Sequence, residues 1–193
     1  MAQLTGSKKI KTAVFISGTG SNLKSLILFS KLKKSPISIN LIISNNSKSK
    51  GLKLGNIFKI KKKIFNFENK NLTETKIILE LKKNKIDLIC LAGFMKILSK
   101  KFINNFKGNI INIHPSLLPK FKGLNTHERA IQNKERYSGC TVHFVNSKLD
   151  SGRIVIQKKV KINKNDTPKT LAKKILTQEH ILYPKAILKI FSL

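Results

Sequence analysis

Three residues in the second half of the sequence have side chains suited to electrostatic and acid–base catalysis. Asn112 and His114 alternate along the apolar run NIINIH, so both can face the same side of a strand. Asp150 lies in the turn-like segment NSKLDSG, in a chain with only nine acidic residues. An amide, an imidazole and a carboxylate together can stabilise an oxyanion and move a proton. Taken singly, a histidine at a strand end is more often structural, and an aspartate in a turn is often only a turn former.

A glycine-rich segment, SGTGSN (17–22), leads from an apolar run into a stretch of helical period. Gly18 and Gly20 allow a tight turn, and the helix start offers free N–H groups and a positive dipole to a phosphate. A dinucleotide fingerprint would need a third glycine where Leu23 stands and an acidic residue after the second strand, and the sequence has neither. The pattern predicts a site for one phosphate and not for NAD, with an ordinary glycine turn as the alternative.

The elements that must position these residues alternate between strand and helix. Short β-branched runs separated by stretches of helical spacing are typical of βαβ units. Several runs are apolar at nearly every position, as in strands covered on both faces. We therefore predict an α/β, Rossmann-like fold with a mostly parallel sheet sandwiched by helices. The expected strands are 11–17, 37–44, 63–67, 87–94, 109–114, 139–145 and 153–162, and the expected helices are 21–34, 49–59, 72–84, 126–133 and 167–191.

The segment HPSLLPKFKGLN (114–125) is punctuated by Pro and Gly and fits neither period. It predicts a long ordered loop at the carboxyl ends of the strands, where open α/β sheets bind ligands. Thr126 is the expected cap of the helix that follows.

The net charge of +30 is the strongest compositional signal, and it would favour a nucleic-acid partner. Only three of the 39 basic residues are Arg, although phosphate and base contacts favour Arg, and the Lys residues are scattered. Asn, Ile and Phe are also abundant while Trp is absent, which indicates compositional drift. We therefore expect no specific nucleic-acid partner.

The remaining composition predicts a cytoplasmic, soluble protein of 193 residues folded as one domain. No stretch is apolar for long enough to span a bilayer, so no membrane partner is expected. Cys90 and Cys140 each lie inside an apolar or β-branched run, as buried free thiols do, and their spacing predicts neither a disulfide nor a metal site.

In their order along the chain, these motifs resemble the glycinamide ribonucleotide formyltransferases, folate-dependent enzymes of purine (IMP) biosynthesis. The match runs from about Ala13 to Pro184. HPSLLP is shared by several formyltransfer enzymes, whereas SGTGSN together with TQEH (177–180) indicates this family. The other matching motifs are DLICLAGFMKILS (87–99), NIINIHPSLLPKFKGLNTHERAI (109–131), GCTVHFV (139–145) and LDSG (149–152).

The resemblance implies transfer of the formyl group of 10-formyltetrahydrofolate, a co-substrate, to the amine of glycinamide ribonucleotide. The amine would attack directly through a tetrahedral intermediate, with no metal. Asn112 and protonated His114 would donate to the developing oxyanion, and Asp150 would order a water and favour the charged imidazole. The ribonucleotide would contact Gly20, Ser21, Asn22 and Glu179, and the folate would contact Lys70, Met95, Lys96, Ile97, Leu98, Asn112, Val145, Asn146, Leu149 and Asp150.

The same resemblance divides the chain into a short lead (1–10), a nucleotide-phosphate half (11–108) and a catalytic, folate-binding half (109–193). Lys96 stands where many relatives have Arg, which would weaken a bidentate grip on the glutamate tail. The sequence leaves open whether the protein is a monomer or a homodimer.

Three alternatives predict features that we do not expect here. A methionyl-tRNA formyltransferase would carry a further domain after Leu193, and a formyltetrahydrofolate hydrolase would carry a regulatory domain before Lys11. A basic nucleic-acid-binding module would show clustered Arg or exposed aromatic side chains.

Overall fold

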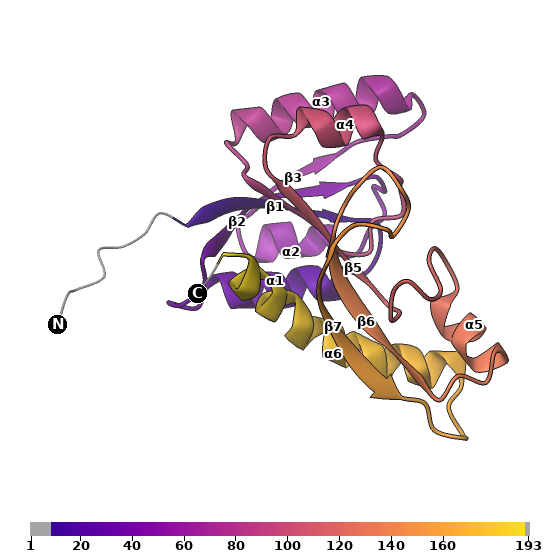
Figure 1. The fold of residues 1–193 in the computed structure, drawn as a ribbon. Helices are drawn as coiled ribbons and strands as arrows, with labels where there is room; N and C mark the ends of the chain where they lie inside the picture. Colours follow the sequence, from indigo (N-terminus) through magenta and orange to yellow (C-terminus); the bar gives the residue numbers. More distant parts are fainter. Residues whose placement is uncertain (1–8, 192–193) are drawn as a thin grey trace.

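Seven strands form one sheet in the computed structural model, which describes residues 9–191 (Figure 1). The order across the sheet is β3-β2-β1-β4-β5-β6-β7. The first five strands in this order are parallel, and β6 and β7 pair antiparallel beside β5. The predicted Rossmann-like α/β fold is confirmed. The strands are β1 (Ile10–Ile16), β2 (Ile37–Ser44), β3 (Lys61–Ile64), β4 (Leu88–Leu91), β5 (Asn109–His114), β6 (Tyr137–Phe144) and β7 (Ile154–Lys161).

Helices cover both faces of the sheet, with α3 and α4 on one face and α1 and α6 on the other (Figure 1). The helices are α1 (Ser21–Ser30), α2 (Leu52–Ile57), α3 (Lys70–Lys83), α4 (Lys100–Asn105), α5 (Thr126–Gln132) and α6 (Pro168–Ile190).

The unbroken apolar runs of the central strands follow from this double cover. In β1, Val14 and Ile16 pack into the core beneath α1 and α6, while Ala13 and Phe15 pack into the core beneath α3 and α4. Successive side chains of a strand point to opposite faces, so both sets must be apolar. All four are fully buried.

Tyr183 fixes α6 across the centre of the sheet. Its hydroxyl lies 3.0 Å from the carbonyl oxygen of Leu91 at the end of β4 and 3.1 Å from that of Ile111 in β5. The side chain is completely buried, so these carbonyls provide the partner that a buried hydroxyl needs. The contact holds α6 against the strand ends that carry the site.

Several predicted boundaries differ from the structure. Helix α4 was not predicted, because its six residues are too few to show a helical period. Thr126 was wrong as the cap of α5: Asn125 precedes the helix in a left-handed conformation (φ 56°), and Thr126 is its first helical residue. The strand expected at 87–94 ends at Leu91, because the chain bends at Ala92 and Gly93. Of the expected lead, residues 1–8 lie outside the described part, and Ile10 already belongs to β1.

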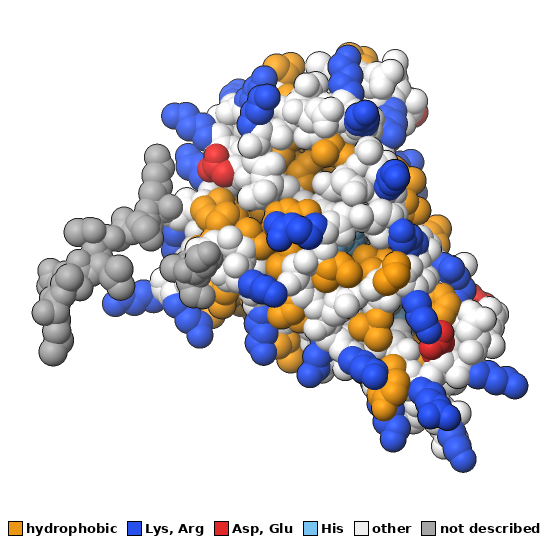
Figure 2. All heavy atoms as spheres, in the orientation of Figure 1, with side chains coloured by type: hydrophobic (Ala, Val, Ile, Leu, Met, Phe, Trp, Pro, Cys, Tyr) orange, Lys and Arg blue, Asp and Glu red, His pale blue; other side chains and the backbone are white. Residues whose placement is uncertain are grey.

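Basic side chains are spread over the visible face without forming one continuous stripe (Figure 2). Edge strand β3 carries three consecutive exposed lysines, Lys61 to Lys63, a composition that discourages pairing with another sheet edge.

Candidate active site

The loops that follow β1, β4 and β5 lie together because these neighbouring strands are parallel and end at the same edge of the sheet. Chain order reverses between β1 and β4, the position at which open α/β sheets form a ligand crevice. The glycine-rich segment follows β1, the loop that carries Met95 (the Met95 loop) follows β4, and His114 is the last residue of β5.

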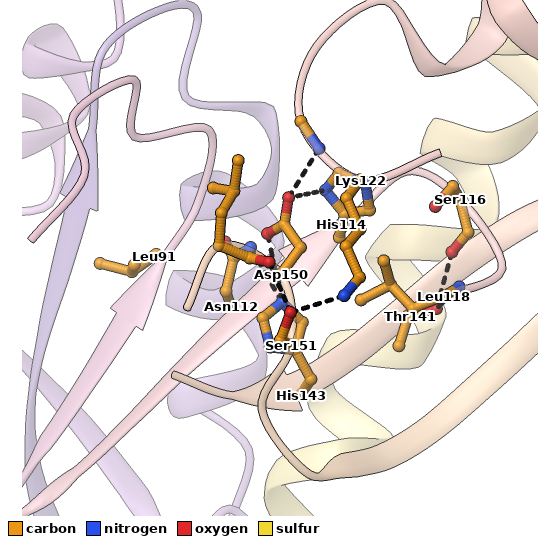
Figure 3. Close-up of polar contacts among 12 residues, drawn as sticks. Leu91, Asn112, His114, Ser116, Leu118, Lys122, Thr141, His143, Asp150 and Ser151 are labelled. Atoms are coloured by element: carbon orange, nitrogen blue, oxygen red, sulfur yellow. Dashed lines mark hydrogen bonds and ion pairs between the residues drawn. The ribbon is translucent and has the colours of Figure 1, made fainter. Parts of the chain in front are cut away.

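Asn112, His114 and Asp150 are brought together at this edge (Figure 3). His114 Nδ1 lies 3.4 Å from Asp150 Oδ2, and the two side chains are only 6% and 9% exposed. Asp150 adopts a left-handed conformation (φ 44°), and its Oδ2 accepts a hydrogen bond of 2.9 Å from the Gly123 N–H. The long loop thus holds the carboxylate against the histidine of β5.

His143 of β6 joins this group, although the sequence analysis gave it no role. Its Nε2 lies 3.3 Å from Asn112 Nδ2 and 3.6 Å from Asp150 Oδ1, and its Nδ1 donates to the carbonyl of Phe144 at 2.9 Å. The signal that could have found it is strand register, because Asn112 pairs directly with His143 in the antiparallel β5–β6 ladder. The ring connects the amide of Asn112 to the carboxylate of Asp150.

Both ring nitrogens of His114 face acceptors: Nε2 lies 2.9 Å from the Phe121 carbonyl oxygen and Nδ1 faces Asp150. Burial nevertheless lowers the pKa of His114 below its ordinary value of 6.5, and the opposing effects of Phe121 and Asp150 do not offset it. The ring is therefore neutral at pH 7 in the protein without substrates. Protonated His114 was expected as a donor to the developing oxyanion, and that expectation stays a prediction, because this lowered pKa belongs to the protein before reaction.

The pKa of Asp150 is lowered below its ordinary 3.8. Burial alone would raise it, but the His143 ring, the Gly123 N–H and His114 outweigh that effect. Asp150 is therefore ionised at neutral pH and carries the negative charge of the group.

Gly20 shapes the glycine-rich loop between β1 and α1. It has φ +79°, and a Cβ at this position would lie 2.7 Å from the Cα of Gly51. The segment before α2 supports the loop: Ser49 Oγ and the Gly51 N–H both donate to the carbonyl of Gly18, at 2.6 and 3.0 Å. The loop leads directly into α1 at Ser21, whose first turn presents free backbone N–H groups.

Asn22 and Glu179 form a buried pair although they lie 157 positions apart. Asn22 Nδ2 donates to Glu179 Oε2 at 2.7 Å. Asn22 Oδ1 is buried and has no hydrogen-bond partner among the described residues. Burial raises the pKa of Glu179 to about 7, against the lowering effect of Asn22. Two of the residues expected to contact the ribonucleotide are thus adjacent.

Replacing Glu179 by Gln should make stability less dependent on pH. The folded protein keeps a proton on Glu179 that the unfolded chain, with an ordinary pKa of 4.5, has already released, so the free energy of unfolding falls as pH rises from 4.5 to about 7. The loss reaches about 3 kcal/mol above this window. Urea unfolding at about pH 5 and about pH 8 measures it. The exposed Glu68→Gln control should keep the wild-type dependence, and an unchanged dependence in Glu179→Gln would contradict the assignment.

The loop after β4 presents side chains beside the glycine-rich loop. Met95, Lys96 and Ile97 are exposed, whereas Leu98 is buried in the core and offers little surface to a ligand. Ser17 connects the two loops: its Oγ accepts the Met95 N–H at 2.8 Å, and its own N–H donates to the carbonyl of Gly93. Two hydrogen bonds of Ser17 therefore join the loop with the phosphate candidates to the loop with the folate candidates.

The other folate candidates lie at the rim. Asn146 and Leu149 are exposed in the turn that carries Asp150, and Val145 is half-buried at the start of that turn. Lys70 is exposed at the first residue of α3. Just before it, Phe67 packs against Phe94 with ring centroids 5.8 Å apart, which places the start of α3 near the loop after β4.

Within residues 9–191 no group of three or more His, Cys, Asp and Glu residues is arranged to hold a metal ion, and no helix there is long and apolar enough to cross a membrane. Cys90 and Cys140 are buried free thiols, as predicted, and burial raises the pKa of each to about 12.

Comparisons with known proteins identify the family of this chain. The family model described as formyl transferase matches residues 10–187. Phosphoribosylglycinamide formyltransferase of Haemophilus influenzae is 42% identical over 180 residues, which cover 92% of this chain and 85% of that protein. The human trifunctional purine biosynthetic protein adenosine-3 is 41% identical over 183 residues; these cover 93% of this chain but only 18% of that much longer protein.

Solved structures show the same fold. The phosphoribosylglycinamide formyltransferase of Brucella melitensis superimposes with a TM-score of 0.89 at 41% identity, covering 95% of this chain and 96% of that one. Glycinamide ribonucleotide transformylase 1 of Symbiobacterium toebii gives a TM-score of 0.91 at 30% identity, covering 97% and 90%. The chain described here belongs to the formyl transferase family.

Proposed function

We propose that the protein transfers the formyl group of 10-formyltetrahydrofolate to the amine of glycinamide ribonucleotide in de novo purine biosynthesis. The observation that carries the proposal is the grouping of Asn112, His114 and Asp150 at the same sheet edge as the glycine-rich loop. A phosphate-binding loop beside an oxyanion-stabilising group suits an acyl acceptor that carries a phosphate.

The first part of the ribonucleotide site is the start of α1. Backbone N–H groups at Gly20, Ser21 and Asn22 would bind the phosphate, because helix starts favour anions. Glu179 and the unpartnered Oδ1 of Asn22 would accept hydrogen bonds from the sugar hydroxyls. Asn22 Oδ1 is an acceptor, and Glu179 is an acceptor through its ionised form, which predominates above about pH 7; both match the donor character of hydroxyls.

The chain's own groups can perform the transfer in a direct attack through a tetrahedral intermediate. The Asn112 amide would donate a hydrogen bond to the formyl oxygen as it gains negative charge, and the His114 Nε2–H, which lies 2.9 Å from the Phe121 carbonyl oxygen, would be shared with the formyl oxygen. That charge raises the proton affinity of His114, which is neutral beforehand, so the ring is protonated as the reaction proceeds. The proton comes from the attacking amine through a water that ionised Asp150 would order, and Asp150 would stabilise the resulting imidazolium. The proton then passes to the folate nitrogen as its bond to the formyl carbon breaks.

The described residues fit a folate at this site. Met95, Ile97 and Leu149 are large apolar side chains that are 62%, 61% and 49% exposed, an exposure that a flat pterin ring would reduce. When bound, 10-formyltetrahydrofolate supplies the formyl group. Lys70 and Lys96, both exposed, would attract the carboxylates of its tail. Val145 and Asn146 would flank the ring, and Leu98 would contribute through its backbone, because its side chain is buried.

We infer that the halves 11–108 and 109–193 act as one domain. The first supplies the glycine-rich phosphate loop and the Met95 loop, and the second supplies Glu179 and the proposed catalytic trio of Asn112, His114 and Asp150. The Asn22–Glu179 hydrogen bond and the contact of Tyr183 with Leu91 join the two halves.

Formyl transfer to glycinamide ribonucleotide is expected from the purified protein. The assay follows the absorbance change when 10-formyltetrahydrofolate loses its formyl group, in the presence and absence of the ribonucleotide. A change that requires the ribonucleotide supports the proposal. An equal change without it would indicate a hydrolase, and formylation of methionyl-tRNA but not of the ribonucleotide would indicate the tRNA enzyme.

A further inference from the structure

Arg129 stands out in a chain that otherwise uses Lys as its cation. Only three of 39 basic residues are Arg, and the other two are Arg136 and Arg153. Arg129 lies on α5 next to the long loop that follows β5. Arg differs from Lys in having a planar charged group whose N–H donors point in fixed directions.

The guanidinium of Arg129 holds the loop through three contacts. Its Nη1 donates to the carbonyl oxygen of Lys122 at 2.7 Å and lies 3.4 Å from that of Leu124. Its Cζ lies 5.3 Å from the centre of the Phe121 ring. The side chain therefore contacts the loop on both sides of Gly123.

Segment 121–124, which Arg129 contacts, provides two backbone groups that bind members of the trio. The carbonyl of Phe121 lies 2.9 Å from His114 Nε2, and the N–H of Gly123 donates to Asp150 Oδ2 at 2.9 Å. Phe121, Gly123 and Asn125 all have positive φ values of 54°, 78° and 56°. Non-glycine residues rarely adopt this conformation, so the segment needs contacts from outside to keep its shape.

We propose that Arg129 is a positioning residue: it holds segment 121–124 so that the Phe121 carbonyl fixes the His114 ring and the Gly123 N–H fixes Asp150. Arg129 itself touches neither side chain of that pair. The neutral His114 ring carries one N–H hydrogen, and an acceptor faces each of its two nitrogens. The Phe121 carbonyl oxygen lies 2.9 Å from Nε2, which is closer than the 3.4 Å between Nδ1 and Asp150 Oδ2. By holding the Phe121 carbonyl in place, Arg129 keeps this hydrogen on Nε2.

Lys cannot replace this function, because an ammonium keeps the charge but has no plane to lie on the Phe121 ring and no fixed donor directions. Arg129→Lys should lower kcat about tenfold and leave both KM values within about twofold, since displaced catalytic groups slow the chemical step. Loss of the Phe121 acceptor should also move the His114 hydrogen towards Nδ1 and Asp150. The ¹⁵N chemical shifts of the four histidines report this tautomer without any substrate.

Two further variants separate positioning from charge and from stability. Arg136→Lys makes the same change at an exposed arginine outside the site and should keep the wild-type kcat. Phe121→Leu removes the ring but keeps the carbonyl, and it should shift the tautomer in the same direction by a smaller amount. Thermal unfolding of each variant shows whether the fold is intact.

The kinetic part rests on the proposed function, whereas the NMR part does not. If the wild-type protein fails to formylate the ribonucleotide, the proposed function fails, and the tautomer still tests the role of Arg129. A wild-type kcat and an unchanged His114 tautomer in folded Arg129→Lys would overturn the inference. Full activity in Arg129→Lys together with a loss in Arg129→Gln would show that only the charge matters.

Discussion

Replacing His114, Asn112 or Asp150 should lower kcat for formyl transfer by about a hundredfold or more, because in the proposed mechanism each acts on charge that develops only in the transition state. His114→Ala and Asn112→Ala each remove a donor to the formyl oxygen. Asp150→Asn removes the negative charge but retains an oxygen that can accept the Gly123 N–H. Its effect therefore isolates the charge of Asp150 from its structural contact.

Steady-state kinetics on each folded variant tests this prediction, and matched substitutions outside the site control for it. Asp166→Asn changes an aspartate that pairs with Lys174 at 2.7 Å before α6. Asn133→Ala changes an exposed asparagine at the end of α5. Both controls should keep kcat close to wild type. Near-normal kcat in a folded trio variant would remove that residue from the mechanism.

His143 is not a member of the trio, and His143→Ala tests whether its ring positions the trio. Its ring lies between Asn112 and Asp150, so its loss should reduce kcat through the position of those two groups. Combining His143→Ala with Asn112→Ala should cost less than the sum of the two single effects, because contacting residues are coupled.

Gly20→Ala should raise KM for glycinamide ribonucleotide about tenfold or more while changing KM for the folate little. The new Cβ would lie 2.7 Å from the Cα of Gly51, and φ +79° is unfavourable for alanine. The loop must therefore shift, and the N–H groups that we assign to the phosphate lose their alignment. Stability should also fall, by about 1–2 kcal/mol.

Gly18→Ala is the matched control for the conformational argument, because a Cβ there meets no atom within 4 Å and its φ is not positive. Chemical unfolding should show a wild-type free energy for Gly18→Ala and a reduced one for Gly20→Ala. Initial rates with each substrate varied in turn give both KM values. A rise in the folate KM with an unchanged ribonucleotide KM would mean that the two pockets are assigned the wrong way round.

The sequence was a good guide to elements whose local signal is strong. Long apolar runs such as 11–17 and 37–44 must be strands buried on two faces, and β1 and β2 lie there. The helix signal of 167–191 was confirmed by α6, which Thr167 caps. The short helix α4 was not predicted from the sequence. Ser99 caps it, and the Ser99 N–H donates to the carboxylate of Glu74 in α3, a contact that only the folded chain makes.

The sequence by itself determined the fold class and the types of side chain in the candidate catalytic group, because alternating apolar periods and the motifs around His114 are local properties of the chain. Only the tertiary structure decided how those groups are joined. The pairing of Asn112 with His143 depends on strand register, and the Asn22–Glu179 contact depends on how α6 packs against α1. The protonation of His114 was also decided there, because a pKa responds to burial, and burial is a property of the folded molecule and not of a motif.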